Sequence, residues 1–178
     1  MTTPYATSTP SIVPRMRRAA ALDASLYEEV EHDTSATGQA AVVVALAAVA
    51  SAVGNAWRGG PGLINGLVGS LLGWAVWSGI TYLVGTRVFA GRATWGEVLR
   101  TLGFAQAPGV LLALAIVPVL GGLVRLVVGV WLLVTGFVAL RQALDIDGLK
   151  TFLTVALGWL AFVAAQVLLA SVLGVRLY

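Results

Sequence analysis

The chain has 178 residues, of which 58% are hydrophobic and only 11% charged, and its mean hydropathy is +0.91. Because soluble domains carry roughly a quarter charged residues, this composition excludes an ordinary soluble domain and indicates an integral membrane protein. The absence of cysteine excludes disulfides, thiolate metal sites and cysteine catalysis. The net charge of +3 is explained by arginines flanking membrane spans, since no basic cluster carries interleaved aromatic residues, and no nucleic-acid partner is expected.

The first 14 residues are small and polar and contain three prolines, so they are predicted to form a disordered tail. Residues 15–36 form a different, amphipathic segment that we expect on the cytoplasmic side. Apolar residues recur in it at helical spacing and predict one helix over Arg15–Asp33; they are Met16, Ala19, Leu22, Leu26 and Val30. This helix lies either on the membrane surface or against the protein's own cytoplasmic face, since anionic lipid would repel its acidic residues.

Residues 37–178 are predicted to form the transmembrane domain. Four long apolar runs in it read as membrane spans, at about residues 38–57, 62–84, 123–140 and 151–173. The second run places small residues on one face, which predicts close helix packing there, with Leu substitutions at Gly66 and Gly73 more damaging than at Gly136; these small residues are Gly62, Gly66, Gly69, Ser70 and Gly73.

The stretch from Thr94 to Gly122 decides how the spans pair. Thr94 and Glu97 have the spacing of a capping box, which predicts a helix start. The apolar run 109–120 would rise only about 18 Å as a helix, against a hydrocarbon core of about 30 Å. Either the helix therefore begins further back and passes a kink at Pro108, or the segment enters the bilayer and turns. The residues from Pro118 to Gly122 are predicted to form a hairpin turn before the next span.

Three further side chains in this stretch carry predictions. The amide of Gln106 is placed to satisfy a carbonyl that loses its helical donor at Pro108. Glu97 and Arg100 are three residues apart and are expected to pair near the cytoplasmic surface. An exposed pair contributes at most about 1 kcal/mol, so we expect this helix end, together with Arg15–Asp33, to be a docking surface, and charge reversal at Arg100 to leave folding nearly unchanged.

A crossing third segment gives five spans, with the N-terminus cytoplasmic and the C-terminus outside; a re-entrant one gives four. The five-span arrangement satisfies the positive-inside rule. It places only Arg58, Arg125 and Arg176 outside and puts the other basic residues on the cytoplasmic side, namely Arg15, Arg17, Arg18, Arg87, Arg92, Arg100, Arg141 and Lys150.

The sequence lacks phosphate-binding loops, paired catalytic carboxylates, zinc spacing and a nucleophile elbow, so no catalytic activity, cofactor or metal is expected. His32 is the one histidine, and with Glu28 one turn back it offers too few ligands for a metal. The predicted spans contain no Asp or Glu, which disfavours a proton- or cation-coupled transporter. A small transporter or channel remains the alternative function, and its path would use polar residues such as Asn65, Ser70, Gln106 and Gln166.

The segment from Arg100 to Leu120 resembles the Yip-domain membrane proteins in their bacterial branch, with Gly103-Phe104-Ala105 followed by Pro108, and Pro118 followed by Gly121. The run Leu26-Tyr27-Glu28-Glu29-Val30 and Trp131 fit the same branch. The resemblance implies five spans, a cytoplasmic N-terminus, a bacterial inner membrane and no catalysis. Eukaryotic members resemble trafficking factors that bind prenylated small GTPases through Asp-Leu-Tyr-Gly-Pro. Only the Leu-Tyr pair matches here, so a GTPase partner is not carried over.

The expected protein is thus an all-α integral membrane protein, a bundle of five transmembrane helices with a Pro-kinked third span and an N-terminal amphipathic cytoplasmic helix. It is expected to act through protein or lipid contacts at the cytoplasmic face, in a membrane-organising or trafficking-like role. Its expected partners are the lipid bilayer and another membrane protein or a second copy of itself. The candidate interaction or structural residues are Tyr27, Glu28, Glu97, Arg100, Gln106, Pro108 and Pro118.

Overall fold

The computed structural model of the chain describes residues 11–58 and 62–173, and in the last helix it describes side chains only through Ala164 and at Val167. All regular structure in these residues is helical. The α-helices are α1 (Ile12–Ala20), α2 (Ala24–His32), α3 (Ala36–Gly54), α4 (Leu63–Val88), α5 (Trp95–Ala105), α6 (Gly121–Leu144) and α7 (Gly148–Leu173). Two 3₁₀-helices join them, η1 (Ala56–Arg58) and η2 (Ala107–Ile116).

Four of the helical segments are long and apolar enough to cross a membrane: α3, α4, the pair α5–η2 and α6. Their outward faces expose large apolar side chains, such as Leu72 (61%), Leu126 (66%) and Leu123 (60%). Exposed apolar faces of this size mark a surface that lipid covers. The protein is therefore an integral membrane protein, and α7 adds a shorter apolar stretch, Gly148–Ala164, within the described side chains.

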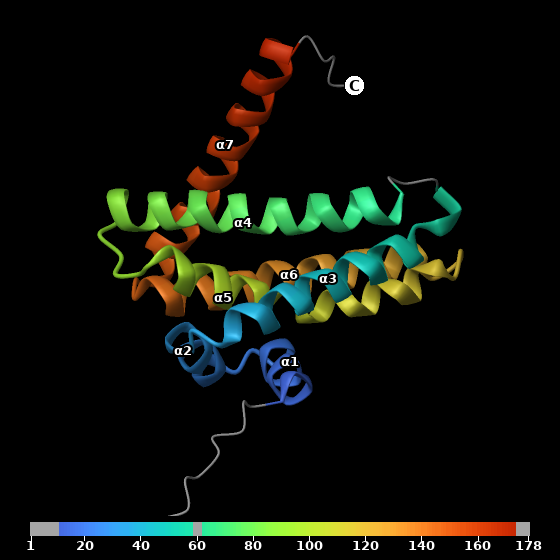
Figure 1. Ribbon diagram of the computed structural model, residues 1–178, viewed down its shortest axis with the longest axis horizontal. Coiled ribbons are helices and arrows are strands. Elements are labelled where there is room, and N and C mark those ends of the chain that lie inside the picture. The colour runs from blue at the N-terminus through green and yellow to red at the C-terminus, as the bar shows by residue number, and fades with distance from the viewer. Residues whose placement is uncertain (1–10, 59–61, 174–178) are drawn as a thin grey trace, which may run out of the picture.

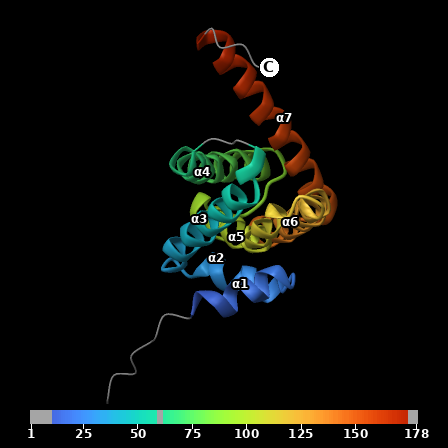
Figure 2. The ribbon, with the colours of Figure 1, turned by 90° about the vertical axis from the view of Figure 1, so that its right-hand side faces the viewer.

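The four long segments run side by side, with α3, α5–η2 and α6 packed together and α4 along one face (Figure 1). The most extensive packing is between α3 and η2. Helix α7 contacts α4 and α6 and then runs obliquely away from the bundle (Figures 1 and 2). Helices α1 and α2 lie together against the opposite flank, where they contact α5, η2 and α6.

The prediction of one N-terminal helix over Arg15–Asp33 is wrong. Two helices form, and the chain turns between them at Leu22, whose φ of 62° is in the left-handed region. The side chain of Asp23 accepts a hydrogen bond from Ser25 N at 3.0 Å and so caps α2, which favours a new helix over continuation of the first. Residues 12–14, assigned above to the tail, belong to α1, because a proline is tolerated in a first helical turn. The rest of the tail, residues 1–10, lies outside the described residues.

The stretch 94–122 begins as predicted. Thr94 and Glu97 form the capping box, with Glu97 N bonded to Thr94 Oγ1 and Thr94 N to the Glu97 carboxylate. At Gln106 the α-helix gives way to η2, in which Gly109 N–H bonds to Gln106 O. The carbonyl of Ala105 therefore receives its hydrogen bond from elsewhere, namely from the buried hydroxyl of Thr135 on α6 at 2.8 Å. The role predicted for the side-chain amide of Gln106 concerns a different carbonyl, that of Phe104, four residues before Pro108. Among the described residues this amide forms no hydrogen bond to it, so that prediction is wrong.

The small-residue face predicted on α4 makes no close helix contact at Gly62, Gly69 or Gly73. A Cβ added at Gly62, Gly69 or Gly73 would meet nothing within 4 Å, and the same is true of Gly136. The predicted difference between Gly73 and Gly136 therefore fails. The reason is that α4 stands apart from its neighbours along this face, where a cavity lies.

Close backbone approach occurs instead between α3 and the α5–η2 segment. A Cβ at Gly103 would lie 2.7 Å from the Cβ of Ala40, and one at Gly109 would lie 2.9 Å from the Cβ of Ala47. The two contacts are seven residues, or two helical turns, apart on α3. Small residues on both sides let the helix backbones approach closely, which is a main source of association in lipid.

Candidate functional site: a membrane cavity and the α2 junction

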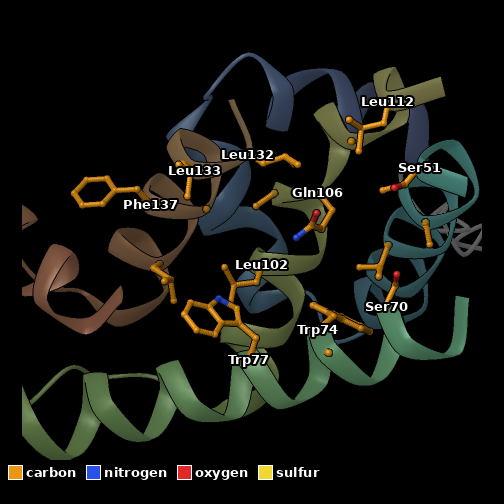
Figure 3. A pocket seen from close by; sticks show the side chains of 18 of the residues that line it. Ser51, Ser70, Trp74, Trp77, Leu102, Gln106, Leu112, Leu132, Leu133 and Phe137 are labelled. Carbon is orange, nitrogen blue, oxygen red and sulfur yellow. The ribbon is translucent and has the colours of Figure 1, made fainter. Parts of the chain in front are cut away.

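A cavity of about 490 Å³ lies between α3, α4, α5–η2 and α6 (Figure 3). Most of its lining is apolar or aromatic, with Trp74 and Trp77 from α4 and Phe137 from α6. Its polar groups come from Ser51, Ser70 and Gln106. A cavity of this size, largely apolar with a few polar groups, is typical of sites for small apolar or amphiphilic ligands.

Gln106 is the polar group at the centre of this cavity. Figure 3 shows its side chain extending between Leu102 and Leu132 toward the α4 tryptophans. Its side-chain amide forms no hydrogen bond within the part of the chain that the structure describes. The indole of Trp74, by contrast, is held by the Leu99 carbonyl at 2.9 Å. Gln106 therefore presents a free donor and acceptor to whatever enters.

A second, larger cavity adjoins the first between α3 and α4. The two share Ala48, Ser51 and Ser70 in their linings. The second is more polar and reaches Asn55, Arg58 and Asn65. Of the path residues named from the sequence, Asn65, Ser70 and Gln106 thus line adjoining cavities, while the side chain of Gln166 lies outside the described residues.

The second part of the site, here called the α2 junction, is where the end of α2 meets α5. Arg100 is only 6% exposed, and its guanidinium donates to the carbonyl oxygen of Val30 at 2.9 Å and to that of Glu31. These carbonyls belong to the last turn of α2, whose carbonyls lack helical donors. The predicted Glu97–Arg100 pair does not form, because Glu97 closes the capping box and Arg100 caps α2.

A second buried arginine, Arg15, fixes the position of α1. It is 3% exposed and donates to Glu29 at 2.9 Å, Asp33 at 2.7 Å and Gln39 at 3.1 Å. Arg15 thereby ties α1 to the C-terminal half of α2 and to the start of α3. The indole of Trp131, on α6, adds a bond to the carbonyl of Ala20 at 2.8 Å.

The carboxylates of this network have shifted pKa values. Hydrogen bonds from Ser25 and Arg18 lower the pKa of Asp23 to about 2. Hydrogen bonds from Ser35 and Arg15 lower the pKa of Asp33. Burial and the negative charge of Glu28 raise the pKa of Glu31, in contrast, to about 7. Of these three carboxyl groups, only Glu31 has surroundings that disfavour its ionised form.

The remaining candidate residues fall in different places. Tyr27 is fully buried, with its hydroxyl on the Ala19 carbonyl at 3.1 Å, so it is a core residue and not a contact surface. Glu28 is exposed on α2. Pro108 is buried at the start of η2, and Pro118 is exposed in the turn before α6.

Comparison with known families decides the identity of the fold. A protein-family model described as the Yip1 domain matches residues 25–170, which cover α2 through nearly all of α7. The chain belongs to the Yip1 domain family. No curated protein and no solved structure matched this chain.

The match places the cavity and the α2 junction inside the Yip1 domain, while α1 precedes it. The buried anchors of this Yip1 protein were missed by sequence reasoning. Arg15 was counted as a charge beside the membrane, and its partners Glu29 and Gln39 are 14 and 24 residues away. The sequence does contain a signal for the burial of Arg15. This residue precedes Ala19 by four residues and therefore lies on the same helix face as the apolar residues of α1.

Proposed function

We propose that this Yip1 protein is a non-catalytic membrane protein that acts through protein or lipid contacts at the face formed by α1 and α2. The observation that carries the proposal is the fixed docking of these helices by Arg15, Arg100 and Trp131. A docked unit presents a preformed surface, which reduces the ordering cost of binding. Its outer side exposes Arg17, Glu28 and His32.

We further propose five spans, with α5–η2 as a bent third span and α7 as the fifth, and with the α2 junction on the cytoplasmic side. Charge supports this orientation. Exposed basic residues cluster at the end of the bundle nearest α2, namely Arg87, Arg92, Arg141 and Lys150. The opposite end carries Arg58 and Arg125, and Arg125 is engaged with the Gly54 carbonyl at 2.7 Å. A bacterial inner membrane is the proposed location.

Cysteine labelling tests this topology. The chain has no cysteine, so single cysteines at Thr34, Trp57, Asp147 and Tyr178 report without background. In intact cells an impermeant maleimide should label the cysteines at Trp57 and Tyr178 and should spare the other two until the membrane is opened. Labelling of the Tyr178 cysteine only after opening would instead mean an even number of spans.

A second candidate function, a small transporter or solute-binding protein, is supported by the cavity. Its lining combines an apolar wall with the unbonded amide of Gln106, and it adjoins a second cavity that the polar residues Asn55 and Asn65 line. The absence of Asp and Glu from α3, α4, α5 after its first turn, and η2 disfavours coupling to protons or cations.

One set of variants separates the two functions. Under the contact function, Arg17→Glu should reduce the proteins cross-linked to this chain in native membranes at least about fivefold, whereas Arg58→Glu, at the other end of the bundle, should not. Under the solute function, Gly136→Leu should fill the cavity and remove small-molecule adducts seen by native mass spectrometry of the purified protein. Loss of adducts on Gly136→Leu, with unchanged cross-linking on Arg17→Glu, would contradict the contact function.

A further inference from the structure

The last turn of α2 gathers three potential metal ligands that sequence reasoning did not combine. Glu28, Glu31 and His32 are spaced i, i+3 and i+4, so they share one helix face. One ligand atom from each lies within 4.8 Å of the others. The sequence alone suggested Glu28 and His32, and two ligands are too few. The fold adds Glu31 as the third.

The surroundings of the Glu31 carboxylate indicate that it can bind a cation. Its side chain is 8% exposed, and its Oε2 is buried with no hydrogen-bond partner among the described residues. Its other oxygen, Oε1, lies 3.7 Å from Nδ1 of His32. A buried carboxylate oxygen without a partner is costly, and the ring beside it compensates only when protonated.

The surroundings of Glu31 are acidic. The negative charges that act on it come from Glu28 on its own helix, Glu97 on α5 and Asp145 at the end of α6. The facing cation is Arg100, whose Nε and Nη2 donate to the backbone carbonyls of Val30 and Glu31 rather than to the Glu31 carboxylate. The C-terminus of a helix also carries partial negative charge. The field at this point therefore favours an added cation.

His32 is placed to serve as the nitrogen ligand. Its Nδ1 lies 2.9 Å from the Glu28 carbonyl, and because a carbonyl only accepts, Nδ1 carries the proton of the neutral ring. Nε2 then keeps the lone pair that a metal needs, an arrangement common among metal-binding histidines. In the metal-free protein it is Nδ1 that lies 3.7 Å from Glu31 Oε1. Because His32 and Glu28 are both exposed, the proposed site requires the imidazole to turn so that Nε2 reaches the ion.

We propose that Glu28, Glu31 and His32 form a binding site for a divalent cation of the zinc class at the end of α2. One imidazole and two carboxylates suit zinc better than magnesium or calcium, which favour oxygen ligands alone. Three protein ligands leave a fourth position open to water or to a donor from a partner. Two carboxylates also neutralise the charge of the ion. A bound cation would fix the end of α2 beside Arg100.

Zinc binding by the purified full-length protein tests the proposal. The chain has one histidine and no cysteine, so a preparation with a histidine-free tag has little competing background. After treatment with a chelator, the wild-type protein should bind one Zn²⁺ saturably in calorimetry. Hydrogen exchange at the amides of α2 should slow when Zn²⁺ is added. Mg²⁺ at the same concentration should produce neither effect.

Three variants complete the test. His32→Ala and Glu31→Gln should each weaken zinc binding at least about tenfold while leaving the metal-free melting temperature close to that of the wild type or higher. Glu97→Gln is the matched control, because it removes a nearby negative charge without removing a ligand and should retain binding within about threefold. Absence of saturable zinc binding by the wild type, or binding by His32→Ala equal to that of the wild type, would overturn the site.

Discussion

Replacing Arg15 with alanine should destabilise the docking of α1 and α2 by about 2–3 kcal/mol, because hydrogen bonds to charged groups contribute about 1.5–3 kcal/mol and several are lost together. The figure stays below the about 3–5 kcal/mol of a broken buried ion pair, because Glu29 and Asp33 are 36% and 25% exposed and can be hydrated. Hydrogen exchange at the amides of α1 and α2 measures the effect directly.

Arg17→Ala is the matched control, since this arginine is exposed on the same helix. It should change the opening free energy of α1 by less than about 0.5 kcal/mol. Equal protection factors in the two variants would show that Arg15 does not anchor α1.

The effect of Arg15→Ala should also depend on pH. Its partner Asp33 has a folded-state pKa below the ordinary value of 3.8, so the folded state binds fewer protons than the unfolded state. The stability from this group is therefore present above about pH 4 and is lost as the pH falls through the lowered pKa. The difference between wild type and Arg15→Ala should accordingly shrink as the pH of the exchange measurement is lowered below 3.8, the ordinary pKa of an aspartate, through the lower folded-state pKa.

Substituting leucine for Gly103 should destabilise the membrane domain by about 3 kcal/mol or more, at the upper end of overpacking costs. The first added carbon would already lie 2.7 Å from the Cβ of Ala40 and 3.1 Å from Trp74. The helices α3 and α5 would have to separate. Their separation would also disturb the second close contact, between Ala47 of α3 and Gly109 of η2. Thermal unfolding in mild detergent should show a large drop in melting temperature.

Gly136→Leu provides the comparison for Gly103→Leu. It adds the same side chain at a position of α6 that lines the cavity. There nothing lies within 4 Å of the new Cβ, and the cavity has room for the leucine. Its melting temperature should stay close to that of the wild type. Similar losses at the two positions would remove the claim that α3 and α5 approach closely at Gly103.

Local features of this Yip1 protein were predictable because their causes lie within a few residues. Composition alone gave the membrane class, and four of the apolar runs became α3, α4, α6 and α7 with ends shifted by a few residues. The Thr94–Glu97 capping box formed because both partners lie in one helical turn. The five-span count and the orientation of the termini stay predictions.

Features that depend on residues far apart in the chain were decided by the tertiary structure. Arg100 has the same local spacing to Glu97 whether or not α2 is present, yet the carbonyls of Val30 and Glu31 outcompete that pairing because they are buried and lack other donors. Thr135 on α6, 30 residues away in the chain, likewise supplies the hydrogen bond that the Ala105 carbonyl does not receive within its own helix.

Packing among the glycines followed the same rule. A helix face of small residues permits another helix backbone to approach closely. Whether it does so depends on which helix packs against that face. Here Ala40 and Ala47 of α3 meet Gly103 and Gly109, whereas Gly73 on α4 faces a cavity. The sequence by itself thus determined that the chain is helical and lies in a membrane. Only the assembled fold decided which side chains are buried together. The physical reason is that a buried polar group without a hydrogen bond costs free energy, and so does a void that deprives side chains of van der Waals contacts.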